Sequence, residues 1–321
     1  MDRVSLLGGA ARALDRVSRR RETPVVLCID VEPDPAVFDP ADPPPWLGFE
    51  RLIQRLPALR RRLSEVTGAP AAFTWFLRMD PQVAETWGSP VWLAEQYADV
   101  LAEVTGAGDE LGLHTHVDRW ETKTGEFVAD FEDPAWAEHC VDMALGAFET
   151  SFGRGCAAHR GGSRFLSGAM LSTLQTRGVV VDLTVEPAQA PATEIDRAAR
   201  GLTPDYRGVP TRPYRSTPSG FPAPDPAART GPLLVPLLSI RRRRPPFRRV
   251  PLPPGEPFPM PNLAAELLRR PPIVAVAVRS HSALEPVWDI IEKNLEHLAH
   301  HHQLVFTTAS EATDRYKRRT A

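Results

Sequence analysis

The 321-residue sequence contains few cysteines and almost no net charge. Its three cysteines, Cys28, Cys140 and Cys156, show no Cys-x-x-Cys spacing, so we expect a reducing compartment and no disulfide framework. The 38 lysines and arginines nearly balance the 40 aspartates and glutamates, and a net charge of -2 argues against a nucleic-acid partner. The amino-terminal residues include no uninterrupted apolar stretch typical of a signal peptide or membrane span, so we expect a cytoplasmic protein.

Three common motifs of nucleotide-binding proteins and hydrolases are also absent. The sequence has no Gly-x-Ser-x-Gly of a serine hydrolase, no Gly-x-x-x-x-Gly-Lys-Ser/Thr phosphate loop and no Gly-x-Gly-x-x-Gly dinucleotide turn. Proline, in contrast, is abundant, with 34 residues in bunches. Prolines, arginines and glycines dominate residues from about 187 to 262, which is too long for a bare loop. We therefore expect this stretch to be an insertion that covers a site.

Apolar runs alternate with helical patterns along most of the chain. Runs typical of strands buried on both faces occupy residues 24–29, 71–77, 111–117, 156–159, 179–184, 273–278 and 304–308. Helices are expected over about 49–67 (kinked or restarted at Pro57), 91–105, 133–152, 167–175, 283–300 and from 311. This alternation predicts an α/β protein built from parallel β/α units.

Polar residues repeatedly follow these strands. Asp30 and Glu32 come directly after the first apolar run, and His114 and His116 end the third. Other strand ends carry Arg78, Asp80, Arg160, Asp182 and His281. Because a parallel barrel gathers its strand ends at one face, we expect these side chains to form one site.

The pair His114-x-His116 indicates a metal site. Residues two apart on a strand point to the same side, so the two imidazoles lie next to each other. Two imidazoles and a carboxylate leave open positions on a divalent ion for a water molecule and a substrate carbonyl. Hydrolysis of an acyl bond also needs a second carboxylate, which takes the proton of the water molecule. An arginine can hold that carboxylate, and a histidine near the end of the chain can protonate the leaving group.

Other charged residues are less specific. His139 is expected at the surface or in packing. The three histidines at 300–302 lie at the end of a predicted helix, and the carboxyl end of a helix favours positively charged side chains. The arginines at 241–244 and 248–249 could bind phosphate or an anionic glycan, although a solvated charged loop is the favoured interpretation.

The order of the strand-end motifs resembles that of the NodB-type polysaccharide deacetylases (carbohydrate esterase family 4), especially a divergent branch with Asp-x-Glu and His-x-His. The resemblance implies Asp30 as catalytic base, and Glu32, His114 and His116 as metal ligands. The remaining catalytic residues that it implies are Arg160, which pairs with the base, Asp182, and the general acid His281. The spacing leaves an exchange of roles open, with Glu32 as base and Asp30 or Asp34 on the metal.

The same resemblance implies a distorted (β/α) barrel of about seven parallel strands. It forms a single domain over residues 23–321, after a basic lead-in at 1–22. The expected cofactor is a divalent metal ion, zinc before other transition metals. The expected reaction is removal of an N-acetyl or O-acetyl group from a sugar or glycan precursor. Two alternatives stay open: a barrel hydrolase that cleaves a non-sugar C–N bond such as a cyclic amide, and a catalytically inactive barrel kept for binding.

Overall fold

The computed structural model describes residues 22–34, 39–193, 198–241, 249–252, 254–300 and 304–320. The predicted lead-in therefore lies almost wholly outside the described residues. The arginines between 242 and 248 and the histidines at 301 and 302 also lie outside them.

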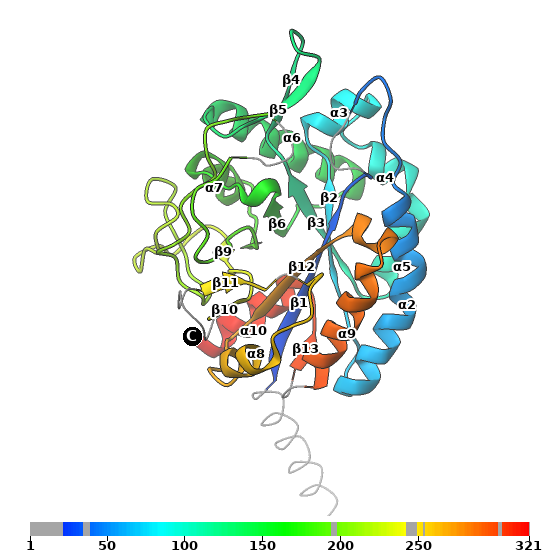
Figure 1. Ribbon diagram of the computed structural model, residues 1–321. Helices are drawn as coiled ribbons and strands as arrows, with labels where there is room; N and C mark the ends of the chain where they lie inside the picture. Colours follow the sequence, from blue (N-terminus) through cyan, green and yellow to red (C-terminus); the bar gives the residue numbers. More distant parts are fainter. Residues whose placement is uncertain are drawn as a thin grey trace, which may run out of the picture.

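An eight-stranded parallel sheet curls through the centre of the molecule (Figure 1). The strand order is β12-β1-β2-β3-β6-β7-β9, and β13 pairs with the first residues of β1. The strands are β1 (Thr23–Val31), β2 (Thr74–Arg78), β3 (Glu110–Thr115), β6 (Ala158–Gly161), β7 (Val181–Asp182), β9 (Leu233–Leu234), β12 (Val274–Arg279) and β13 (Leu304–Phe306). This arrangement confirms the predicted distorted (β/α) barrel of parallel strands.

The segment after β9 joins the two edges of the sheet. The Leu237 N–H donates to the Val185 carbonyl at 2.9 Å, and the Leu238 N–H donates to Ala275 of β12 at 2.8 Å. Both leucines lie within the stretch predicted as an insertion. That part of the stretch is therefore barrel wall, and does not cover the site.

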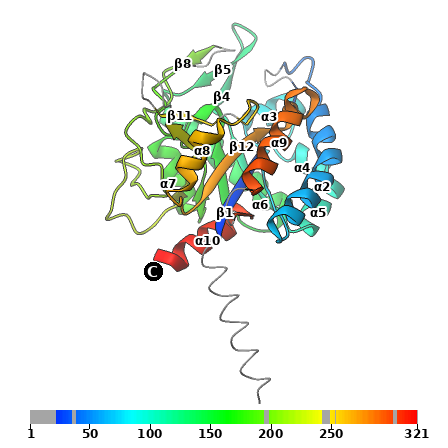
Figure 2. The ribbon, with the colours of Figure 1, turned by 60° about the horizontal axis from the view of Figure 1, so that its bottom comes forward.

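Side-chain alternation divides each strand between two cores. Larger side chains face outward and pack against the helices: Leu27, Ile29, Trp75, Leu77 and Leu113. A smaller inner core fills the barrel: Val26, Cys28, Phe76, Ala158, Val181, Leu183, Leu233, Val235 and Ala275. Ala309 and Ala312 of α10 (Ala309–Thr320) join this inner core, so α10 covers the amino-terminal end of the barrel (Figures 1 and 2). Asp30 continues the inward series of Val26 and Cys28, and therefore faces the interior at the opposite end.

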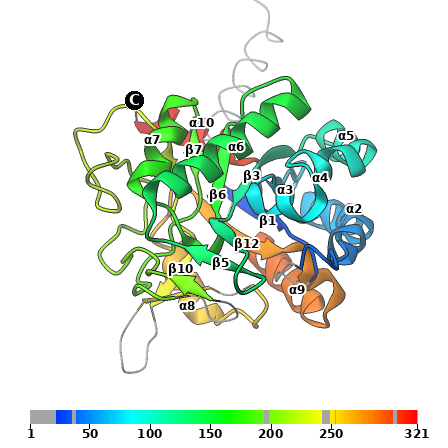
Figure 3. The ribbon, with the colours of Figure 1, turned by 90° about the horizontal axis from the view of Figure 1, so that it is seen from above.

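The helices surround the sheet (Figure 3). They are α2 (Leu47–Thr67), α3 (Pro81–Trp87), α4 (Trp92–Gln96), α5 (Ala98–Gly106), α6 (Pro134–Phe152), α7 (Gly168–Thr176), α8 (Met260–Leu267) and α9 (Val287–His300). α2 runs through Pro57 as one helix, so a new start there is wrong; buried Leu52, Leu56 and Leu59 hold both halves on the core. The helix predicted over 91–105 is divided at Tyr97.

Two small sheets were not predicted. A hairpin of β4 (Asp118–Glu121) and β5 (Glu126–Asp130) pairs with β8 (Ala199–Arg200) and projects beyond the carboxyl ends of the barrel strands (Figure 1). β10 (Ser239–Arg241) pairs with β11 (Arg249–Pro251). Within the described ranges, no helix combines the length and apolar composition that a membrane crossing needs.

Candidate metal centre

Glu32, His114 and His116 converge at the carboxyl ends of β1 and β3, and all three side chains are buried. Oε1 of Glu32 lies 3.2 Å from Nε2 of His114 and 3.0 Å from Nε2 of His116. The two Nε2 atoms are 3.1 Å apart. Metal–ligand bonds of about 2.0–2.1 Å place neighbouring ligand atoms roughly 2.9–3.4 Å apart in octahedral or tetrahedral coordination. The three donor atoms therefore fit a single divalent ion.

The protonation of the cluster also suits a metal. The Nδ1–H of His114 is positioned to donate to the Arg160 carbonyl at 3.0 Å, which leaves the Nε2 lone pair facing the cluster. Burial lowers the pKa of His114 and favours the neutral imidazole that binds metals. Burial alone would raise the pKa of Glu32, but the adjacent His114 and His116 rings lower it well below its usual range. The other carboxylate oxygen of Glu32, Oε2, is buried without a hydrogen-bond partner among the described residues and lies 3.8 Å from Nε of Arg279.

Three charged residues behind the ligands hold them in place. The His116 main-chain N–H donates to Asp80 at 2.9 Å, and its Nδ1 lies 3.4 Å from the Asp118 carboxylate. Fully buried Arg78 binds Asp80 at 2.6 Å and lies 3.9 Å from Glu32. Such outer groups orient metal ligands. The structure places Arg78 and Asp80 beside the cluster, as their strand-end positions in the sequence predict.

Gly162 provides the space for the His116 ring. A Cβ atom at position 162 would lie 2.0 Å from Cδ2 and 2.2 Å from Nε2 of His116. The two residues that follow, Ser163 and Arg164, both have left-handed backbones, with φ of 53° and 58°. Strained non-glycine residues of this kind gather at functional sites.

Asp30 lies beside the three ligands and is paired with Arg160. The Arg160 Nε–H donates to both carboxylate oxygens, at 2.9 and 3.0 Å, and one Nη1–H donates to the Leu183 carbonyl at 2.7 Å. Oδ1 of Asp30 is 3.9 Å from Nδ1 of His114. The structure thus brings together five predicted site residues: Asp30, Glu32, His114, His116 and Arg160.

This geometry favours one of the two assignments of the carboxylates. Glu32 is the acidic residue that meets both imidazoles, whereas Asp30 is held by Arg160. Asp34 accepts a hydrogen bond from the Gly48 N–H at 2.6 Å and does not join the ligand cluster. The arrangement therefore favours Glu32 on the metal and Asp30 as base.

Asp182 is not part of this cluster. It accepts hydrogen bonds from Nδ1 of His159 at 2.7 Å, and from the main-chain N–H and hydroxyl of Thr184, each at 2.9 Å. Its chain neighbours face the inner core, so Asp182 faces the helices. Thr184 in turn accepts a hydrogen bond from the Gly161 N–H at 2.7 Å. Asp182 thereby supports the strand end that carries Arg160, and we propose this positioning role in place of a catalytic one.

His281 lies close to the cluster without touching it. Ser280, its neighbour in the chain, accepts a hydrogen bond from the Glu32 N–H at 2.9 Å and donates to the Glu32 carbonyl at 2.8 Å. His281 itself is half-buried near Asp34, and its Nδ1 has no hydrogen-bond partner among the described residues. Its predicted role as general acid stays a prediction.

Sequence reasoning missed one further carboxyl group at the site. Oε1 of Glu186 lies 3.9 Å from Nη2 of Arg160. Burial raises the pKa of Glu186, while the charges of Arg160, Arg164 and Arg279 oppose that shift. Glu186 follows the predicted strand 179–184 by two residues, and this placement was the available signal.

Comparison with solved structures identifies the fold. The chain is similar to a probable polysaccharide deacetylase from Pseudomonas aeruginosa PAO1, with 12% identity, a TM-score of 0.53, and coverage of 94% of this chain and 92% of that one. PuuE allantoinase matches with 12% identity and a TM-score of 0.51, over 93% of this chain and 91% of that one. No family model matches the sequence, and no curated protein does. The chain has the NodB-type fold of polysaccharide deacetylases.

Proposed function

We propose that the protein is a metal-dependent hydrolase that removes an N-acetyl or O-acetyl group from a sugar or glycan precursor. The observation that carries this proposal is the buried cluster itself. A two-histidine, one-carboxylate set stands next to a separate carboxylate that an arginine holds. Metal ligands and an independent base are the two components that hydrolysis of an acyl bond needs. A cytoplasmic location is part of the proposal.

Each residue has a distinct task. Glu32, His114 and His116 would hold a divalent ion, zinc before other transition metals. When bound, that ion polarises the substrate carbonyl and lowers the pKa of water. Asp30 accepts the proton of the attacking water, while the two hydrogen bonds from Arg160 fix its carboxylate. His281 gives a proton to the departing amine or alcohol.

A second candidate is hydrolysis of a non-sugar C–N bond. The similarity in fold to PuuE allantoinase favours this alternative, because that solved structure shares the architecture and is named an allantoinase, not a deacetylase. The metal ligands and the base would keep their tasks, and only the substrate would change. A catalytically inactive binding barrel is the third hypothesis.

The decisive experiment measures metal content and then acetate release from N-acetylated and O-acetylated sugars. Asp30→Asn and His114→Ala should lose acetate release, and exposed Asp205→Asn is the matched control. Opening of cyclic amides without acetate release would favour the second candidate. Bound metal with neither activity would favour the binding barrel. Full activity in both site variants would refute the site assignment.

A further inference from the structure

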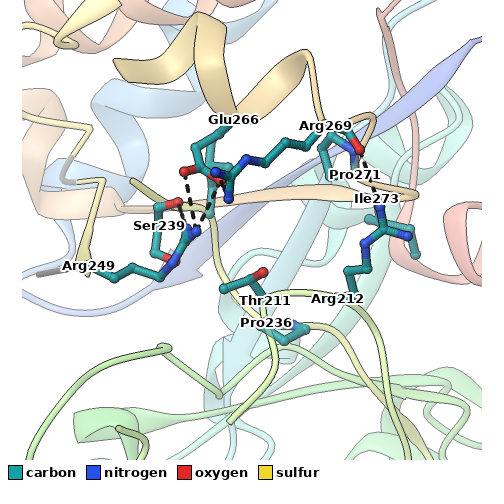
Figure 4. A pocket seen from close by; sticks show the side chains of 10 residues that line it. Thr211, Arg212, Pro236, Ser239, Arg249, Glu266, Arg269, Pro271 and Ile273 are labelled. Carbon is teal, nitrogen blue, oxygen red and sulfur yellow. Dashed lines mark hydrogen bonds and ion pairs between the residues drawn. The ribbon is translucent and has the colours of Figure 1, made fainter. Parts of the chain in front are cut away.

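Figure 4 shows residues that line a cavity of about 380 Å³. This cavity lies at the other end of the barrel from the metal centre. Its wall includes Ile273, which directly precedes β12, whereas Arg279 at the end of β12 lies 3.8 Å from Glu32. Six residue steps along a strand span about 20 Å. Residues of α8, β10 and β11 also line the cavity. The cavity is therefore separate from the proposed active site.

The charged lining of this cavity is mainly positive. Arg212, Arg249 and Arg269 face one carboxylate, Glu266. Nη2 of Arg249 lies 3.2 and 3.1 Å from the two oxygens of Glu266, and Nη1 of Arg269 lies 3.7 Å from one of them. One carboxylate balances one guanidinium, so two positive charges are not compensated by the lining.

The three arginines differ in how they are held. Arg249 is largely buried, and its Nη1 donates to the main chain and hydroxyl of Ser239. The exposed side chain of Arg212 makes one hydrogen bond among the described residues, to the Arg269 carbonyl at 3.2 Å. The Arg269 guanidinium, also exposed, makes the 3.7 Å ion pair and no hydrogen bond within the described ranges. Arg212 and Arg269 therefore retain N–H donors for a ligand.

We infer that this cavity binds the phosphate group of a small molecule. A phosphate monoester carries close to two negative charges at neutral pH, which matches the uncompensated charge of the lining. Guanidinium groups bind phosphate oxygens with paired hydrogen bonds. The volume exceeds that of a phosphate, and Pro236, Leu238 and Ile273 offer apolar wall to an organic group. Arg249 belongs to the arginine-rich stretch at 241–249, for which the sequence favours a solvated charged loop. Its side chain is only 13% exposed, so Arg249 is not a solvated loop residue.

The test is calorimetric titration of the full chain with inorganic phosphate and with a sugar phosphate monoester, at constant ionic strength. We expect both to bind, and Arg212→Ala and Arg269→Ala each to weaken binding by roughly tenfold or more, the cost of a charged hydrogen bond. Exposed Arg207→Ala, which removes an arginine paired with Asp205, is the matched control. Because both substitutions lie at exposed positions, circular dichroism should show an unchanged fold.

Three outcomes would overturn the inference. They are no binding at millimolar phosphate, equal binding of acetate, and unchanged binding in both arginine variants. His114→Ala separates this cavity from the metal centre, since phosphate binding should persist in that variant. Loss of phosphate binding in His114→Ala would indicate that phosphate binds at the metal centre instead. Tighter binding of the sugar phosphate would identify an organic phosphate as the ligand, and equal binding would identify free phosphate.

Discussion

Replacing Gly162 with alanine should damage the candidate metal centre without removing one of its proposed ligands. The added Cβ would lie 2.0, 2.2 and 2.4 Å from three atoms of the His116 ring. Ordinary contact begins at 3.4 Å, so the ring must move by about 1.4 Å. Metal–ligand distances tolerate about 0.2 Å. His116 would therefore leave the coordination sphere, and we expect zinc affinity to fall by about 100-fold or more, at least as much as loss of an outer-shell partner costs.

Zinc binding to the metal-free protein, measured by competition with a chelator, gives the affinity directly. Gly146→Ala is the matched control, because nothing lies within 4 Å of its Cβ and residue 146 is inside α6. Its affinity should be unchanged, and alanine should stabilise the helix by about 1 kcal/mol.

A double-mutant cycle isolates the contact between Gly162 and His116. In a His116→Ala background the ring is absent, so Gly162→Ala should cause no further loss of affinity. Native affinity in Gly162→Ala would refute the geometry. An additional loss in the double variant would show that the alanine acts through the backbone and not through the ring.

Three further predictions concern the carboxylates around the site. Asp30→Asn should lower acetate release by about 10²–10⁴-fold while the metal content stays native, and loss of metal would contradict its role as base. Asp182→Ala leaves three buried donors without an acceptor. Urea denaturation should show a loss of about 3 kcal/mol in unfolding free energy with unchanged metal content, and metal loss would place Asp182 at the centre. Burial raises the pKa of Glu186 in the folded chain above its ordinary value of 4.5. Below that ordinary pKa the protonated group stabilises the fold, and this stabilisation is lost as the pH rises through the pKa of the folded state. The unfolding free energy of Glu186→Gln relative to the native chain should therefore increase from about pH 4 to pH 7. A difference between the two chains that does not change with pH would contradict the raised pKa of Glu186.

The sequence was sufficient to predict the main strands and the grouping of His114 with His116 because both are local patterns. Strands buried on both faces are continuous apolar runs, and His114-x-His116 is adjacent in the chain. Parallel topology then brings the ends of β1, β3 and β6 together, which places Glu32 and Arg160 beside the histidines.

Features that depend on distant partners were not predicted. The β4–β5 hairpin pairs with β8, about seventy residues later, and the barrel closes through Leu238 and Ala275. The need for glycine at 162 appears only when the His116 ring is placed against it. Asp182 lies apart from the cluster for a different reason: its motif position suggested the site, whereas strand alternation turns its side chain toward the helices.

The most direct test of the metal centre is the zinc content of the purified chain after zinc loading and dialysis, measured by mass spectrometry. The native protein should retain one zinc ion per chain, and a His114→Ala, His116→Ala double variant should retain none while keeping its circular dichroism spectrum. A native chain that retains no zinc or other divalent metal, or a folded double variant that retains as much as the native chain, would contradict a metal centre at Glu32, His114 and His116.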